Sequence, residues 1–154
     1  MKLFKKEGSC MKKTNPKTEK VALRWLQYSN KDLENASYLI NAKPDSFALV
    51  CWLCQQSAEK AIKSALTLEQ IRVTHIHDLD SLLDMLPGNW IVKNEHTDLS
   101  KITGWSVSAR YPGDWPEPTY EDATRAKSVT HSIYGLISAE FERRGILLGD
   151  ARGG

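Results

Sequence analysis

Arg110, Tyr111 and Pro112 combine a basic and an aromatic side chain in a way that could bind an anion. Because proline ends a helix, this segment places a guanidinium group and a ring at the edge of a loop. Arg110 could hold a phosphate through two parallel hydrogen bonds. The alternative is that Arg110 caps the free carbonyl groups of the helix while Tyr111 packs under the following proline-rich loop. The sequence favours neither interpretation over the other.

A second basic pair, Lys60 and Lys63, follows Glu59. Three residues nearly complete one helical turn, so on a helix both amines extend from one side and could line a phosphate cleft. Such a pair is also typical of a solvated helix face, where long lysine stems cover apolar surface. We therefore retain both lysines as candidate phosphate-binding residues beside this simpler interpretation.

His75, His77 and Asp78, together with Cys51 and Cys54, are residue types that bind zinc. A tetrahedral zinc site normally pairs two well-separated clusters of ligands, and this spacing does not follow that pattern. The two cysteines are instead expected as small residues of the core, and His77 with Asp78 at the start of a helix. We predict no metal site.

Several common enzyme signatures are missing. The nine glycines are scattered, and none forms the spaced set with which a phosphate-binding loop opens a helix after a strand. A serine nucleophile elbow and the helix-bound His-Glu-x-x-His zinc signature are absent as well. These absences argue against a classical ATPase, dehydrogenase or hydrolase, and no cofactor is predicted.

Charge and composition favour one cytoplasmic domain. The 154 residues suffice for a single core. Residues 1–20 carry seven lysines and two glutamates, which gives this segment a net charge of +5. Because the whole chain has a net charge of +2, the remaining residues carry −3. Composition therefore gives no sign of a broad positive surface, and any anion site is expected to be local. The odd cysteine count indicates a reducing compartment, and neither a secretory signal nor an apolar run of membrane-spanning length is evident.

The elements that must position these residues are helices. Apolar residues recur every three or four positions, whereas alternating strand patterns are hard to find. The pattern predicts helices over residues 17–41, 45–68, 76–86, 98–110 and 119–144. Residues 1–16 are expected to form a basic tail, residues 17–145 the helical bundle, and residues 146–154 a C-terminal tail.

The order of these features resembles the HEPN family, which is named for its occurrence in higher eukaryotes and prokaryotes and for nucleotide binding. The resemblance covers roughly residues 20–140. The matching elements are Trp25 and Leu26, the run from Asp32 to Ala36, the segment from Phe47 to Lys63, His77-Asp78-Leu79 with Leu82 and Leu83, and Arg110-Tyr111-Pro112.

The resemblance implies an all-α fold, an up-and-down antiparallel bundle of four to five helices, that pairs as a homodimer with a polar cleft near the dimer seam. Members of the family occur beside minimal nucleotidyltransferases in toxin-antitoxin-like systems. The HEPN protein is then either a substrate-binding companion of the transferase or a toxin, often a metal-independent ribonuclease. Both roles require contacts with nucleotide or RNA phosphates.

The ribonuclease branch of the family has an arginine followed four to six residues later by a histidine. Arg125 and His131 are the matching pair here, and the chemistry is sensible because imidazole can move a proton while guanidinium stabilises charge on a phosphorane. Ala126 departs from the polar residue usual after the arginine. Two helical positions six apart also point about 120° away from each other, so a second subunit would have to complete the site. The simpler interpretation is a solvated Arg125 and a partly buried His131.

The sequence therefore predicts a HEPN-type dimer that binds nucleotide or RNA as partner of a minimal nucleotidyltransferase. An endoribonuclease with a composite site of Arg125 and His131 is the alternative. A helical scaffold that dimerises and binds no nucleotide is the third interpretation.

Overall fold

The computed structural model describes residues 14–108 and 111–149. These residues contain six α-helices and no strand. The helices are α1 (Pro16–Asn41), α2 (Ala48–Leu68), α3 (Leu79–Asp84), α4 (Ile91–Glu95), α5 (Ser100–Ser108) and α6 (Tyr120–Arg143). The predicted all-α, up-and-down bundle is confirmed, with six helices among the described residues where four to five were expected. All five predicted helices are found: α1 begins one residue earlier than predicted, α5 begins two residues later, and α2, α3 and α6 are shorter. The short helix α4, which follows the Pro87-Gly88 turn, was not predicted.

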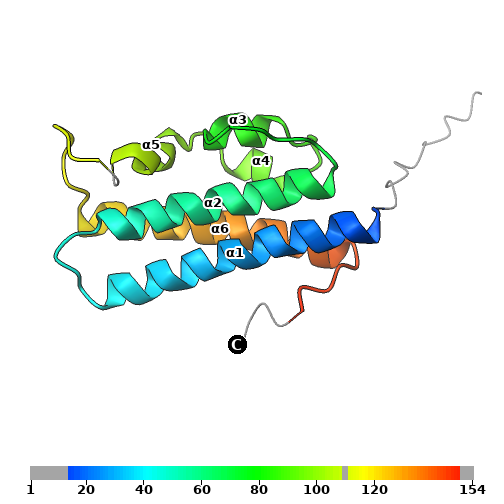
Figure 1. Ribbon diagram of the computed structural model, residues 1–154, viewed down its shortest axis with the longest axis horizontal. Helices are drawn as coiled ribbons and strands as arrows, with labels where there is room; N and C mark the ends of the chain where they lie inside the picture. Colours follow the sequence, from blue (N-terminus) through cyan, green and yellow to red (C-terminus); the bar gives the residue numbers. More distant parts are fainter. Residues whose placement is uncertain (1–13, 109–110, 150–154) are drawn as a thin grey trace, which may run out of the picture.

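Three long helices form the body of the bundle. Helices α1 and α2 lie side by side and run in opposite directions, and α6 packs behind both of them (Figure 1). The short helices α3, α4 and α5 cover the other side of α2, with α5 and α3 in direct contact with it. The segment from α3 to α5 thus takes the place of the fourth bundle member.

Helix α1 begins and ends where the sequence provides signals. The side chain of Asn15 accepts a hydrogen bond from the Lys17 amide at 2.9 Å, and Pro16 occupies the first turn, where its missing amide hydrogen costs nothing. The helix ends before Lys43, which has a φ of +50°, and Pro44 follows it. The buried face of α1 repeats every three or four residues: Ala22, Leu26, Ser29, Leu33, Ala36 and Ile40.

Two serines hold α1 and α2 close together. The Ser29 hydroxyl donates to the carbonyl oxygen of Ser57 at 2.7 Å, and the Ser57 hydroxyl donates to that of Ser29 at 2.8 Å. Both residues are fully buried, so small side chains that satisfy their own polar groups set the spacing of the two helices. Small residues of this kind on α2 permit the close approach of the two helices.

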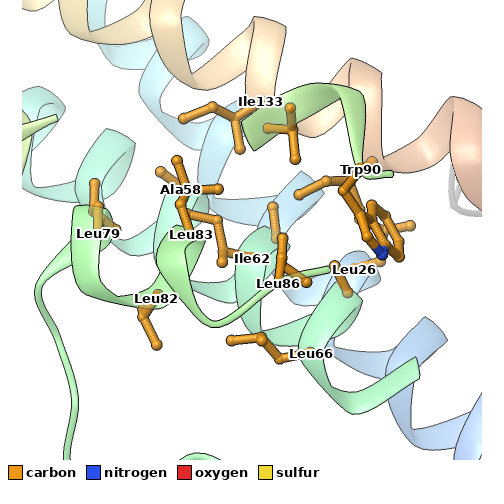
Figure 2. Close-up of a cluster of buried hydrophobic side chains, with 14 of the residues drawn as sticks. Leu26, Ala58, Ile62, Leu66, Leu79, Leu82, Leu83, Leu86, Trp90 and Ile133 are labelled. Atoms are coloured by element: carbon orange, nitrogen blue, oxygen red, sulfur yellow. The ribbon is translucent and has the colours of Figure 1, made fainter. Parts of the chain in front are cut away.

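The hydrophobic core lies where α2 meets the short helices and α6. Figure 2 shows Leu79, Leu82, Leu83 and Leu86 in one cluster with Ala58, Ile62 and Leu66 of α2, with Ile133 of α6 above them. Trp90 closes one end of this cluster and is 1% exposed. Its indole nitrogen donates to Glu69 at 2.8 Å, so the ring is buried without leaving its polar atom unpaired.

Helix α6 has the most complete start and stop signals. The Thr119 hydroxyl accepts a hydrogen bond from the Asp122 amide, and the Asp122 carboxylate accepts one from the Thr119 amide, which makes a reciprocal cap. At the other end Gly145, with φ +79°, lets the amide of Ile146 return to the carbonyl of Phe141 at 3.0 Å. Within the described residues, no helix combines the length and apolar character needed to cross a membrane.

Candidate nucleic-acid interface

The outer face of α1 carries a row of basic side chains interrupted by one aromatic ring. Because an α-helix has 3.6 residues per turn, the exposed side chains of Lys17, Lys20, Arg24, Tyr28 and Lys31 lie along one stripe. We call these five residues the α1 stripe. The side chains of Lys17, Lys20 and Arg24 make no ion pair or hydrogen bond with any other part of the chain that the structure describes.

Helix α2 adds two further cations at the side of the α1 stripe. Lys60 forms an ion pair with Asp32 of α1. Lys63 forms one with Glu59 at 2.7 Å, and its amine also lies 5.9 Å from the centre of the Trp25 ring. The two lysines predicted from the sequence as phosphate-binding residues therefore lie beside each other at the α1–α2 boundary.

Glu59 anchors this boundary from below the surface. It is 7% exposed and lies among three polar partners: Gln55 donates to it at 2.9 Å, Lys63 at 2.7 Å, and the His77 Nδ1 atom lies at 2.9 Å. Burial alone raises the pKa of a carboxyl group, but the hydrogen bonds from Lys63, Gln55 and His77 together outweigh it and leave the pKa of Glu59 below its ordinary value. The carboxylate therefore stays charged and fixes Lys63 in place.

The electrostatic sign of this region is positive. The α1 stripe, Lys60 and Lys63 together contribute six cationic side chains, while Asp32 and Glu59 contribute two carboxylates that are both ion-paired. A shallow hollow of about 220 Å³ opens at its centre. The hollow is lined by Val21, Arg24, Trp25, Tyr28 and Lys60.

A second cleft, of about 280 Å³, lies between α6 and the segment that joins α4 to α5. The lining includes Arg125, Lys101 and His96 as well as the carboxylates of Glu95, Asp98 and Asp122. Its carboxylates thus outnumber its permanent cations, which disfavours an anion. The complete lining is Glu95, His96, Thr97, Asp98, Leu99, Lys101, Ile102, Trp105, Asp122, Arg125, Ala126 and Val129.

Most charged groups of this cleft already have partners. Lys101 pairs with Asp122 at 3.0 Å, and the hydrogen bond from the Thr119 amide, followed by the one from Lys101, lowers the pKa of Asp122. Asp98 accepts hydrogen bonds from the amide and hydroxyl of Ser100. Arg125, by contrast, is exposed and has no hydrogen bond or ion pair within residues 14–108 and 111–149. A ligand would meet Arg125 as the one unpaired cation there.

The histidine that shares a cleft with Arg125 is His96, which the sequence did not single out. Its Nε2 atom lies 3.0 Å from the hydroxyl of Ser132. Burial lowers the pKa of His96, although the nearby charge of Glu95 acts in the opposite direction. The imidazole is therefore mainly neutral near pH 7 and can accept a proton.

The structure does not bring Arg125 and His131 into one site within a single chain. Both residues are exposed on α6, and Arg125 faces the α4–α5 segment, whereas His131 does not line that cleft. A composite site across two subunits stays a prediction. Arg110 lies outside the described residues, and Tyr111 is 57% exposed in the loop after α5, so their anion site stays a prediction as well.

The α1 stripe contains the functional candidates that the sequence interpretation missed. The charge balance suggested no basic surface, because Lys17 and Lys20 were counted with residues 1–20, whereas Arg24 and Lys31 belong to the remainder, whose net charge is −3. The signal was present in the spacing of positions 17, 20, 24, 28 and 31, which repeats every three or four residues. A search for basic periodicity on a single helix would have found it.

The cysteines are buried, as predicted. Cys51 and Cys54 are both 0% exposed, and burial raises the pKa of each thiol to about 12. Across residues 14–108 and 111–149, no group of three or more histidine, cysteine, aspartate or glutamate side chains has the arrangement of a metal site. His77 contacts Glu59, and Asp78 caps α3 through the Ser81 amide at 2.9 Å.

Comparison with known proteins identifies the class. The family model of the HEPN domain matches residues 22–140, which contain the α1 stripe from Arg24 onward, Lys60, Lys63 and the cleft beside α6. The chain belongs to the HEPN family. None of the curated proteins compared with it matches.

Two solved structures share the fold. One is the crystal structure of TT1696 from Thermus thermophilus, with a TM-score of 0.63 and 23% identity over 77% of this chain and 96% of that chain. The other is the crystal structure of ST0689, an archaeal HEPN homologue, with a TM-score of 0.58 and 24% identity over the same shares of the two chains. At these identities the likeness concerns the fold.

Proposed function

We propose that this HEPN-domain protein binds nucleotides or single-stranded RNA along the α1 stripe, as a homodimer that acts beside a minimal nucleotidyltransferase. The observation that carries the binding proposal is the row of cations on α1, interleaved with Trp25 and Tyr28. The homodimer and the nucleotidyltransferase partner are supported by the family resemblance. The binding proposal can be tested without either of them.

The length and composition of the α1 stripe suit a flexible, negatively charged strand. From Lys17 to Lys31 the helix rises about 21 Å, which allows contacts with several consecutive phosphates. Proteins that bind single strands combine a positive surface that follows the backbone with aromatic rings on which bases stack. The α1 stripe and Trp25 supply both parts on one rigid helix, so little of the binding surface has to be ordered when the ligand arrives.

The test is the salt dependence of RNA binding. In a fluorescence anisotropy titration with a labelled single-stranded oligouridylate, the double variant Lys20→Ala/Arg24→Ala is expected to bind about tenfold more weakly at low salt. Because each phosphate contact contributes about 0.7 to the slope of log affinity against log salt for a single strand, the slope should fall by about 1.4. These substitutions are on the exposed side of α1 and leave the core intact.

The matched control removes two positive charges elsewhere. Arg72 and Lys43 are exposed in the loops after α2 and α1, and the double variant Arg72→Ala/Lys43→Asn retains a residue that tolerates the positive φ of position 43. It should bind like the parent protein. Equal losses in both double variants would mean that only net charge matters, and the proposal of an interface on α1 would be wrong.

A ribonuclease activity is the second candidate function, and one observation favours it. Arg125 and His131 are both exposed on α6, where a second subunit could combine them. If this function is correct, His131→Ala and Arg125→Ala should each abolish cleavage of single-stranded RNA in the absence of metal ions. Unchanged cleavage in His131→Ala would exclude this pair.

A further inference from the structure

The residues that line the hollow on α1 are suited to binding a flat aromatic group. Val21, Trp25 and Tyr28 provide an apolar surface, and the aliphatic stems of Arg24 and Lys60 complete the lining. Val21 is 50% exposed and Tyr28 is 47% exposed. These two large side chains are not part of the core and are in contact with water at the edge of the hollow. Exposed apolar surface in a concave place, with basic residues beside it, is typical of a ligand site.

The rings of Trp25 and Tyr28 each lie close to a lysine amine. The Lys31 amine lies 5.4 Å from the centre of the Tyr28 ring, and the Lys63 amine lies 5.9 Å from that of Trp25. Neither lysine lines the hollow, so these ammonium groups lie outside it. Each ring therefore has a cation near it that does not occupy the hollow, while the ring itself contributes to the lining of the hollow.

The size of the hollow limits the partner. Drug-sized ligands occupy pockets of about 300–1,000 Å³, whereas this hollow measures about 220 Å³. A single planar ring system fits within that limit. Arg24 has no ion-pair partner among the described residues, so its guanidinium group can meet a negative charge attached to that ring system.

We infer that the hollow between Val21, Trp25 and Tyr28 holds one nucleobase, stacked on an aromatic side chain, with the attached phosphate against Arg24. The base comes from a single-stranded RNA or from a free nucleotide. The inference rests on the proposed function, because it assigns the base-binding point within the α1 stripe. Recognition by stacking accepts all four bases, since every base has a π face, and it requires that the base be unpaired.

The experiment compares ligands with and without a base. Isothermal titration of the full-length protein uses an oligoadenylate and an oligomer of the same length and charge whose ribose units lack bases. The parent protein should bind the oligoadenylate about tenfold more tightly, the range expected for one base stacked on an aromatic side chain. Adenosine 5′-monophosphate against ribose 5-phosphate distinguishes the free nucleotide from the strand as the source of the base.

Two variants make the comparison specific. Tyr28→Ala removes half-exposed surface from the hollow and is expected to bind the oligoadenylate and the abasic oligomer equally. Tyr38→Ala is the matched control, because Tyr38 is on the same helix, is 77% exposed and does not line the hollow. It should retain the preference for the base.

Each other outcome overturns the inference in a recognisable way. If the parent protein binds both oligomers equally and with strong salt dependence, the α1 stripe binds phosphates and the hollow holds no base. If Tyr28→Ala keeps the base preference, the base is not held in the hollow. A changed oligomeric state in that variant would then identify the hollow as a contact between copies of the chain. If the parent protein binds neither oligomer, the proposed function itself fails.

Discussion

Glu59 is the residue whose chemistry links the core to the candidate interface. Its carboxylate lies under the surface, and three side chains surround it: Gln55, Lys63 and His77. A charged group is tolerated there because its hydrogen bonds replace those lost to water. The same bonds direct the Lys63 amine toward Trp25. Sequence reasoning placed Lys63 near a phosphate cleft but had no means of finding His77 beside Glu59, because that contact depends on the loop after α2.

The substitution Glu59→Gln should lower the free energy of unfolding at pH 7 by about 1–3 kcal/mol, because Lys63 loses its charged partner. The pKa of Glu59 is depressed in the folded protein, so its stabilising contribution is fully present above the ordinary pKa of glutamate. It is lost as the pH falls through the folded pKa. Urea unfolding at pH 7 and at pH 3.5 should therefore show a difference between variant and parent that shrinks in acid. Glu34→Gln, on the exposed side of α1, is the control and should change stability little at either pH.

The cysteines provide a second prediction at the scale of single residues. With the thiol pKa of Cys51 and Cys54 raised to about 12, only about one thiol in ten thousand is ionised at pH 8. In a Cys10→Ser background, both should react with iodoacetamide far more slowly in the folded protein than in urea, as followed by mass spectrometry. Rapid reaction of either cysteine in the folded protein would contradict its burial.

At the scale of elements, the helices could be predicted because their signals are local. The Asn15-Pro16 start of α1 and the Thr119 start of α6 each depend on side chains within a few residues of the helix end. The short helix α4 has no capping side chain, and Trp90 at its start is held instead by the core and by Glu69. Contacts of that kind join residues far apart in the chain, so periodicity could not reveal them. The same reason explains why His96 was missed: its cleft forms only when the α4–α5 segment meets α6.

The contribution of the reciprocal cap of α6 to stability can be tested by mutation. Thr119→Ala should lower the free energy of unfolding by about 1 kcal/mol, because the Asp122 amide loses its acceptor at the helix start. Thermal unfolding followed by circular dichroism measures the effect. The control is Thr124→Ala, an exposed position one turn into the same helix, where alanine is at least as favourable as threonine. If the two variants are equally stable, the cap contributes nothing.

At the scale of the whole molecule, the bundle separates two regions of different charge. The α1 stripe with Lys60 and Lys63 is basic, whereas the cleft between α6 and the α4–α5 segment contains three carboxylates. The net charge of the whole chain, +2, combines these regions with the rest of the molecule and describes neither of them. Function is therefore expected to follow from the local field of one face, which attracts anions and steers their approach.

Dimer formation is the prediction that concerns the entire assembly. Size-exclusion chromatography with light scattering should give twice the mass of one chain at micromolar concentration. A mass of one chain at all concentrations would contradict the predicted homodimer and would also exclude a composite site of Arg125 and His131 across two subunits. It would leave binding by the α1 stripe untouched, because every residue of that stripe belongs to one chain.

The most direct test of binding by α1 is an NMR titration of the isotopically labelled protein with a short single-stranded RNA. If the account is correct, the amide and arginine side-chain signals that move will cluster in residues 17–31 and at Lys60 and Lys63, while those around Arg125 stay in place. Signals that move only around Arg125 and His96, or no movement at all, would contradict it.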